Sequence, residues 1–295
     1  MNCPRFSVIT PSFNQGRFIE ETLRSVLDQA YPNLELLVLD GGSSDNTVEI
    51  LKRYDANLSF WRSEKDAGQA AAINEGFRRA TGDILCWLNS DDLHLPNTLS
   101  TVARLLQERL SEPVVLYGGC EMFRHGTTRT ELRRAIPFSK ELLEIVDFLD
   151  QPSMFWTRKA WELVGPLDES LHYGFDWEWL LRAAPFCLFV TTDAMLSRYR
   201  FHEAHKSGTG GKKRWIELCG IVRRHASPAV VAHYEFLLHN DAAHWWLNKR
   251  MRFFLALQRF LPGLADPMAN LLSPPFWSLP PGIQRNTLWK ISGIR

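Results

Sequence analysis

Two adjacent carboxylates, Asp91 and Asp92, follow an apolar run of strand length that ends at Leu88. Side chains at the carboxyl end of a buried strand in an α/β sheet lie where such folds bind their ligands. Two neighbouring negative charges repel each other unless a cation or strong hydrogen-bond donors compensate them. A divalent ion, Mg²⁺ or Mn²⁺, would do so, because it prefers oxygen ligands and often shares them with a diphosphate. The alternative is an Asx turn that caps the helix predicted to begin near Pro96.

Two further acidic residues follow strand-like runs. Asp40 ends the apolar run 34–39 and precedes two glycines. Without side chains there, a flat ring could approach the backbone while the carboxylate accepts a hydrogen bond from an N–H group, such as the imide of a pyrimidine base. Asp66 and Gly68 precede an Ala-rich helix, whose N-terminus presents free N–H groups to anions. Asp66 could cap that helix or bind the base or sugar of a ligand, and a plain turn would also explain Asp40.

A third acidic group lies among the aromatic residues of segment 174–179. Aromatic surroundings desolvate a carboxylate, which suits a general base that takes a proton from a hydroxyl. Asp176 is the candidate base, and Trp177 and Glu178 are candidates for contact with an acceptor. Acidic residues that complement the dipole of a helix N-terminus would give the same pattern.

Basic residues gather in the last third of the chain. Residues 196–295 contain 15 Lys or Arg and 5 Asp or Glu, a net charge of +10, whereas residues 1–195 carry −9. A basic tail is expected to meet an anionic partner, such as phosphates or a membrane surface. Arg200, His202 and Lys206 could support a leaving diphosphate or a metal, or they could form a solvated basic loop. The sequence contains no zinc-finger, RNP or basic-zipper pattern, so nucleic acid is not expected as a partner.

The first half of the chain alternates strand and helix patterns, which is typical of an α/β sheet. Strands are predicted at 6–10, 34–39, 58–61, 83–88, 114–118 and 154–157, the first of them ended by Pro11. A polar hairpin or loop is predicted at 124–134. Helices are predicted around 19–27, 47–52, 69–80, 96–110 and 177–184.

A change of composition near Gly210 predicts two parts, an α/β domain over 1–210 and a helical, basic and aromatic extension over 211–295. The five cysteines form no C-x-x-C pair, which favours reduced thiols in a cytosolic protein. No signal peptide pattern opens the chain, and no run approaches the ~20 apolar residues that span a bilayer. An integral membrane protein is therefore not expected.

Taken together and in this order, the motifs resemble glycosyltransferase family 2, the inverting enzymes of the GT-A fold. The resemblance extends from about Phe6 to Ser207. The matching stretches are TPSFN at 10–14, VLDGGSSD at 38–45, DAG at 66–68, AINEG at 72–76, TGD at 81–83, LNSDD at 88–92, QPSMF at 151–155, GPLDE at 165–169 and DWEWLLR at 176–182.

The resemblance implies a Rossmann-like mixed central sheet flanked by helices, and a nucleotide-sugar donor that carries UDP or dTDP. It implies that Asp40 contacts the base, with Asp66 close to the base or ribose. Asp91 would lie nearer the ribose, Asp92 would be the direct metal ligand, and Asp176 matches the catalytic base. The further candidates for donor contact are Pro11, Ser12 and Gly68.

Two positions depart from the family pattern. Asn89 stands where many relatives carry an acid, which lowers the negative charge of the site. Segment 211–215 lacks the Gln of the Q-x-x-R-W motif found in processive synthases. A processive polysaccharide synthase is therefore not expected.

The expected reaction is the inverting transfer of a hexose or related sugar from a UDP- or dTDP-sugar to a hydroxyl group of a glycan or lipid-linked acceptor, in bacterial surface polysaccharide or glycolipid synthesis. A metal at Asp92 would neutralise the departing diphosphate, and Asp176 would deprotonate the acceptor. Two alternatives stay open: a non-catalytic relative that binds nucleotide sugars or glycans, and a nucleotidyltransferase. The latter usually shows a Gly-rich loop with a following Arg-Lys, which is not found near the first strand.

The sequence of the extension predicts a contact with a membrane or with another protein surface. Aromatic and basic residues alternate through 244–264, as in a helix that lies in a membrane interface. The cations are not segregated to one face of the helix, so packing on the catalytic domain or on a second subunit is an equal alternative. The expected location is cytoplasmic, either free or peripheral at the inner face of the cell membrane.

Overall fold

The computed structural model describes residues 3–128, 130–203, 205–206, 210–243, 245 and 281–292. The chain forms two compact units. The first contains residues 1–139 and 149–205, and the second contains residues 140–148 and 206–295. The segment 140–148 therefore leaves the first unit to join the second.

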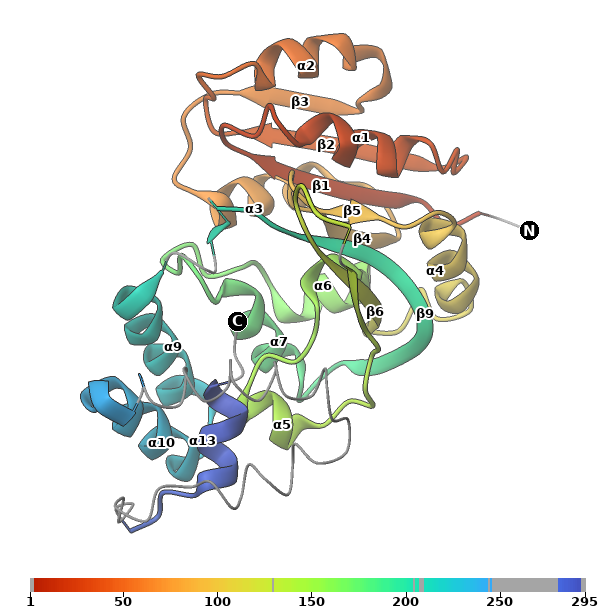
Figure 1. The fold of residues 1–295 in the computed structure, drawn as a ribbon. Helices are drawn as coiled ribbons and strands as arrows, with labels where there is room; N and C mark the ends of the chain where they lie inside the picture. Colours follow the sequence, from red (N-terminus) through yellow and green to blue (C-terminus); the bar gives the residue numbers. More distant parts are fainter. Residues whose placement is uncertain are drawn as a thin grey trace. The chain divides into compact units, whose positions relative to one another are not determined.

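The first unit is built on a nine-stranded mixed sheet (Figure 1). The strands follow the order β3-β2-β1-β4-β8-β6-β9-β5, and β7 pairs with β6 outside this path. This arrangement confirms the expected mixed central sheet. The strands are β1 Phe6–Ser12, β2 Leu34–Asp40, β3 Phe60–Ser63, β4 Ile84–Trp87, β5 Leu93–His94, β6 Val114–Arg124, β7 Thr130–Arg133, β8 Met154–Thr157 and β9 Leu188–Phe201.

Helices cover both faces of this sheet. Apolar side chains of α1, α2 and α4 pack with one face of β1, which includes Phe6 and Val8. On the opposite face, α3, α6 and α7 pack against an aromatic cluster that contains Trp87 and Trp156. Burial on both faces explains why β2 and β4 have near-continuous apolar sequences. These helices are α1 Ile19–Leu27, α2 Thr47–Arg53, α3 Gln69–Arg79, α4 Thr98–Leu106, α6 Arg158–Val164 and α7 Phe175–Ala183.

The strands β3, β2, β1 and β4 are parallel neighbours in the sheet. Their carboxyl ends therefore meet at one edge, where the chain continues into the loops that carry the predicted site residues. Pro11 does not end β1, because the strand continues to Ser12. The side of Pro11 that lacks an N–H group faces the position of β4, whose pairing with β1 stops at Ile9 and Trp87. No ladder hydrogen bond is lost there.

Several predicted boundaries differ from the structure. β3 begins two residues later than predicted, after a short 3₁₀ helix, Asp55–Asn57. Helix α4 is shorter than the predicted 96–110, and β6 is longer than 114–118. The hairpin predicted at 124–134 is confirmed, because β7 pairs with the end of β6. The long curved strand β9 was not predicted (Figure 1).

The second unit is helical, as expected for the extension. It contains α5 Lys140–Ile145, α9 Gly211–His225, α10 Pro228–His239 and α13 Arg285–Ser292. The buried Tyr234 of α10 donates a hydrogen bond to the carbonyl of Ile145, 2.9 Å away. The helix predicted within 244–264 lies outside the described residues, apart from Trp245. In the part of the chain that the structure describes, no helix has the length and apolar character needed to cross a bilayer.

Gly76 allows α3 to lie directly on the sheet. A Cβ atom at this position would lie 2.4 Å from Cγ2 of Ile9 and 3.1 Å from Cδ2 of Leu39. We expect Gly76→Ala to lower the free energy of unfolding by about 1–3 kcal/mol, because overpacking costs more than the helix propensity of alanine returns. Urea denaturation monitored by circular dichroism measures this change.

Gly220 in α9 provides the control, because a Cβ atom there meets no other atom within 4 Å. Gly220→Ala should leave stability unchanged or raise it by up to about 1 kcal/mol through helix propensity. Equal destabilisation by the two substitutions would contradict the close packing of α3 on β1.

Candidate functional site

Asp40 ends β2 and is fully buried. Its Oδ2 accepts hydrogen bonds from the backbone N–H groups of Gly42 and Ser43, at 3.2 and 2.8 Å, and from the hydroxyl of Ser63 at 2.6 Å. Its Oδ1 accepts the hydroxyl hydrogen bond of Ser43 at 2.5 Å. The carboxylate therefore folds the turn that follows β2. The structure argues against the expected contact of Asp40 with a base, because the side chain is enclosed by these donors.

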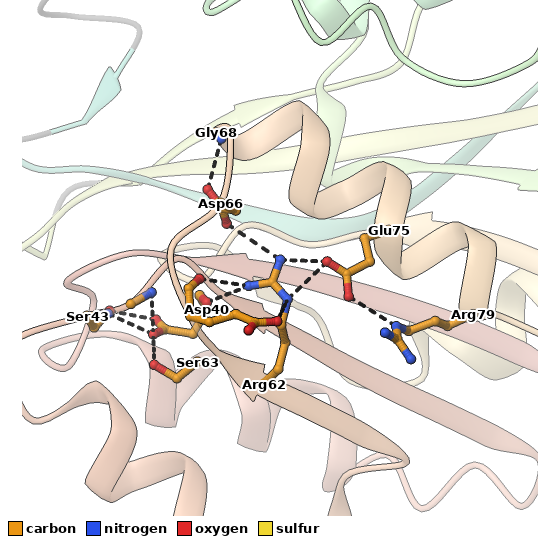
Figure 2. A network of polar contacts seen from close by, with 10 residues as sticks. Asp40, Ser43, Arg62, Ser63, Asp66, Gly68, Glu75 and Arg79 are labelled. Carbon is orange, nitrogen blue, oxygen red and sulfur yellow. Dashed lines mark hydrogen bonds and ion pairs between the residues drawn. The ribbon is translucent and has the colours of Figure 1, made fainter.

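Asp66 lies between Gly68 and Arg62 (Figure 2). Its Oδ2 lies 3.2 Å from the position that a Cβ atom of Gly41 would take, so a side chain at 41 would crowd it. The backbone N–H of Gly68 donates to Oδ1 at 2.9 Å. The side chain of Asp66 remains 17% exposed. It can therefore accept a further hydrogen bond from a ligand that lies over Gly41.

Arg62 holds the loop that carries Asp66. Its Nη1 donates to the carbonyls of Asp40 and Glu64 at 2.8 and 3.0 Å, and its Nη2 lies 3.9 Å from Oδ2 of Asp66. Nε and Nη2 also donate to Glu75 of α3, at 3.0 and 2.7 Å, as Figure 2 shows. The hydrogen bond from Arg62 lowers the pKa of Glu75. Arg62 thus ties β3, the end of β2 and α3 into one support for Asp66.

Phe13 is a residue of this site that the sequence analysis did not single out. It follows β1 directly, and the residue is 61% exposed. Its Cδ2 lies 3.4 Å from the Cβ position of Gly41, so the ring adjoins the same open turn as Asp66. An exposed aromatic residue directly after a buried strand was the available signal. Pro11 and Ser12, the predicted donor contacts, are buried in β1.

Asp92 points into the protein. Its side chain is 1% exposed, and its Oδ1 and Oδ2 accept hydrogen bonds from the backbone N–H of Arg200 at 3.0 Å and from Nδ2 of Asn89 at 3.3 Å. The backbone carbonyl of Asp92 accepts a hydrogen bond from the hydroxyl of Thr22 at 2.8 Å. Burial, with the neighbouring charge of Asp91, raises the pKa of Asp92 well above its usual range.

Asp91 points the other way. Its side chain is 19% exposed, and its Oδ2 lies 2.8 Å from Nε2 of His202. His202 follows the end of β9 and packs against the ring of Phe18, with the ring centroids 4.8 Å apart. His125, which follows β6, packs against the same ring at 5.1 Å. The structure therefore joins Asp91 and His202, which the sequence had predicted for different roles.

The other two predicted diphosphate supports have different positions. Arg200 is buried and bonded to protein groups, among them the carbonyl of Asp91. Because its guanidinium nitrogens have partners inside the protein, the structure argues against a direct diphosphate contact. Lys206 belongs to the second compact unit, so its role stays a prediction.

Asn89 links three elements around the Asp91–Asp92 loop. Its Oδ1 accepts a hydrogen bond from Gln69 at 2.8 Å, and its Nδ2 donates to Gln151 at 3.2 Å as well as to Asp92. Gln151 in turn donates to the carbonyl of Trp87 at 2.8 Å. An acidic side chain at 89 would place a second charge against the buried carboxylate of Asp92. This contact explains why an amide occupies the position.

Asp176 lies in the first turn of α7. The preceding Phe175 packs against Trp87, the last residue of β4, with ring centroids 6.1 Å apart. The N-terminus of α7 therefore lies beside the carboxyl end of β4. Trp177 and Glu178 are buried, and Glu178 accepts two hydrogen bonds from Arg182, at 2.9 and 3.0 Å. Their burial argues against the predicted contact with an acceptor.

Residues 7–161 match the model of the family described as glycosyl transferase family 2. An uncharacterized glycosyltransferase of Mycobacterium tuberculosis is 31% identical over 227 residues, which are 76% of this chain and 83% of that protein. The chain belongs to glycosyl transferase family 2. It spans as little as 36% of the length of one curated relative.

Solved structures show the same fold as this family 2 chain. A mannosyltransferase from Pyrobaculum calidifontis, in complex with GDP-Man and Mn²⁺, gives a TM-score of 0.58 at 20% identity, over 92% of this chain and 80% of that one. The S. aureus protein TarS 1-349, in complex with UDP-GlcNAc, gives 0.56 at 17% identity, over 90% and 83%. The expected GT-A fold is confirmed, and at these identities the likeness concerns the fold alone.

Among the residues that the structure describes, no three or more His, Cys, Asp or Glu side chains form a cluster that could hold a metal ion. The Asp91–His202 pair offers one oxygen and one nitrogen. Mn²⁺ accepts both kinds of ligand, whereas Mg²⁺ prefers oxygen. The pair therefore fits an ion whose remaining ligands come from a diphosphate and water.

Asp40, which precedes the turn after β2, and Asp66, which adjoins that turn from the loop between β3 and α3, should respond differently to the same substitution. The buried carboxylate of Asp40 accepts four hydrogen bonds. Asp40→Asn removes its charge and replaces one accepting oxygen by an NH₂ group, so we expect it to lower the free energy of unfolding by about 1–3 kcal/mol. Asp66→Asn keeps an acceptor for Gly68 at a partly exposed position and should cost about 0.5 kcal/mol or less. Chemical denaturation measures both. A cost for Asp66→Asn as large as that for Asp40→Asn would contradict this division of roles.

Proposed function

We propose that the chain transfers a sugar from a UDP- or dTDP-sugar to a hydroxyl group of a glycan or lipid-linked acceptor, with inversion at the anomeric carbon and with a divalent ion. The observation that carries this proposal is the pairing of Asp91 with His202 at the carboxyl end of β4. In the segments that follow β3 and β1, Asp66 and Phe13 both adjoin Gly41, in the turn after β2. These groups match, respectively, the diphosphate and the base of a nucleotide-sugar donor.

The base subsite would consist of Asp66, Gly41 and Phe13. Phe13 offers an exposed ring face for stacking, and Gly41 lets the base approach the backbone. A carboxylate accepts the imide N–H of uracil or thymine, whereas cytosine and adenine present an acceptor nitrogen at the equivalent edge. The complex of the S. aureus neighbour with UDP-GlcNAc supports a uridine donor. Guanine also presents an N–H group, and the P. calidifontis neighbour binds GDP-Man, so guanine belongs in the test.

Asp91 and His202 would hold the ion, Mn²⁺ or Mg²⁺. The metal ligand would be Asp91 and not Asp92, because the Asp92 carboxylate is buried and accepts hydrogen bonds on both oxygens. When bound, the ion would neutralise the negative charge that develops on the departing diphosphate. Asp92 would then position the loop from inside, while Asp91 faces the ligand.

Asp176 would act as the general base. Its carboxylate would take the proton of the acceptor hydroxyl as that oxygen bonds to the anomeric carbon. The bond from the anomeric carbon to the diphosphate breaks in the same step, and the nucleoside diphosphate leaves from the opposite face. The position of Asp176 beside the carboxyl end of β4, set by the packing of Phe175 on Trp87, supports this role.

A thermal-shift panel tests the donor. The full chain is heated with UDP-GlcNAc, UDP-glucose, dTDP-glucose or GDP-mannose, each with and without Mn²⁺. We expect stabilisation by uridine or thymidine donors that grows with Mn²⁺. Stabilisation by GDP-mannose alone would overturn the base assignment, and tight donor binding without UDP release in any acceptor assay would favour a non-catalytic relative.

Asp91→Asn should weaken the metal-dependent part of donor binding. It removes one charged ligand, so the gain in UDP affinity on adding Mn²⁺ should fall at least about tenfold, whereas metal-free UDP affinity should change little. Isothermal titration with UDP, with and without Mn²⁺, measures both values. Asp193→Asn, at an exposed position of β9, is the matched control. An unchanged Mn²⁺ effect in Asp91→Asn would refute the proposed ligand.

Asp176→Asn should separate binding from turnover. The amide cannot accept the hydroxyl proton, so release of UDP from the donor should slow by ~10²-fold or more, with water or glycan as acceptor. UDP affinity should stay within about twofold, because Asp176 is assigned no contact with the nucleotide. Coupled detection of UDP measures the rate, with Asp193→Asn again as control. Turnover at the normal rate would remove Asp176 from its role.

A further inference from the structure

Arg200 is a buried cation in the strand β9. Its side chain is 2% exposed. Burying a charge costs free energy that an apolar residue at this position would not cost. The guanidinium lies between two phenyl rings, with its Cζ atom 4.8 Å from the centroids of both Phe18 and Phe123. The two rings separate the cation from solvent and hold its plane in place.

Each guanidinium nitrogen of Arg200 has a protein partner. Nε donates to the backbone carbonyl of Asp91 at 2.8 Å, and Nη1 lies 3.4 Å from Nδ1 of His125. Nη2 donates to Glu21 of α1. The backbone N–H of Arg200 donates to the carboxylate of Asp92 at 3.0 Å. One residue thus holds the main chain of Asp91 and the side chain of Asp92 together.

These contacts fix the direction of the Asp91 side chain. The carbonyl of Asp91 and the carboxylate of Asp92 lie on either side of the peptide bond that joins the two residues. Holding both groups restrains the rotation of the peptide unit between them, and with it the direction of the Cα–Cβ bond of Asp91. His202 lies two residues beyond Arg200, so the same strand end carries the partner of the Asp91 carboxylate.

We propose that Arg200 is a positioning residue, which holds Asp91 at the distance from His202 that diphosphate and metal binding require and which does not contact the donor itself. The proposal rests on the function proposed above for its account of what Asp91 binds. It replaces the direct diphosphate contact that the sequence predicted for Arg200.

The competing explanation is that Arg200 only stabilises the fold through its ion pair with Glu21. Glu21 is 62% exposed, and Gln at this position keeps a side-chain oxygen that can accept the hydrogen bond from Nη2, so Arg200 loses its ion-pair partner but not an acceptor. Glu21→Gln therefore removes the ion pair and keeps the bond from Arg200 to the Asp91 carbonyl. Arg200→Lys keeps a cation beside the two rings but removes the Nε donor, and with it the hydrogen bond to the Asp91 carbonyl.

The test compares wild type, Arg200→Lys and Glu21→Gln as full chains by two measurements. Hydrogen exchange with mass spectrometry follows the peptide that covers 88–95, and titration with UDP, with and without Mn²⁺, follows the ligand. We expect Arg200→Lys to exchange faster than wild type in this peptide. We also expect it to lose at least about tenfold of the Mn²⁺-dependent gain in UDP affinity, with its metal-free affinity unchanged. Glu21→Gln should match wild type in both measurements.

Wild-type exchange and a wild-type Mn²⁺ effect in Arg200→Lys would overturn the proposal. So would an equal loss in Glu21→Gln, because the ion pair alone would then explain the effect. If wild type itself shows no Mn²⁺-dependent binding of UDP, the proposed function fails instead. Exchange in the 88–95 peptide then still decides whether Arg200 holds the loop. Arg200→Met, which keeps the aliphatic volume without the charge, serves as the second variant should Arg200→Lys not fold.

Discussion

The burial of one carboxylate, that of Asp92, is the constraint on which the site depends. A buried carboxyl group is costly unless hydrogen bonds within the protein replace those that it loses to water, and here they come from the backbone of Arg200 and the amide of Asn89. The main chain of Asp92 adds a third contact, to Thr22 of α1. The strand β9 and the helix α1 must therefore both meet this loop. Because Asp92 is turned inward, its neighbour Asp91 is turned outward to His202, where a ligand can reach it.

The same division of roles recurs among the other acids of the site. Asp40 is buried and shapes the turn after β2, while Asp66 stays partly exposed above that turn. Glu178 is buried against Arg182, while Asp176 lies in the first turn of the same helix. In each case one acid is buried against protein partners, and the other is less buried. The protein thus keeps several negative charges near one sheet edge without placing them all in contact.

Sequence patterns predicted the elements that are buried on both faces. The apolar runs of β1, β2 and β4 and the periodic faces of α1 and α3 were sufficient, because such burial leaves a continuous signal. The strand β9 shows no such continuous apolar signal, because its 14 residues are only partly buried and include Asp193, Arg198 and Arg200. The acidic residue types of the site could be predicted as well. Which of two neighbouring acids is buried could not, because Asp92 is buried by Arg200, 108 residues further along the chain.

That unpredicted strand also determines the geometry of the site. β9 pairs with β6 on one side and with β5 on the other, and β5 begins at Leu93, directly after Asp92. The loop 88–92 is therefore held by β4 before it and, through β5, by β9 after it. β9 then supplies both the backbone donor for Asp92 and, two residues later, His202. Because one strand carries both contacts, a shift of β9 would move the loop and the histidine together and preserve the spacing of Asp91 and His202. If the donor to Asp92 and the partner of Asp91 lay on separate elements, a shift of either element would change the spacing of Asp91 and His202.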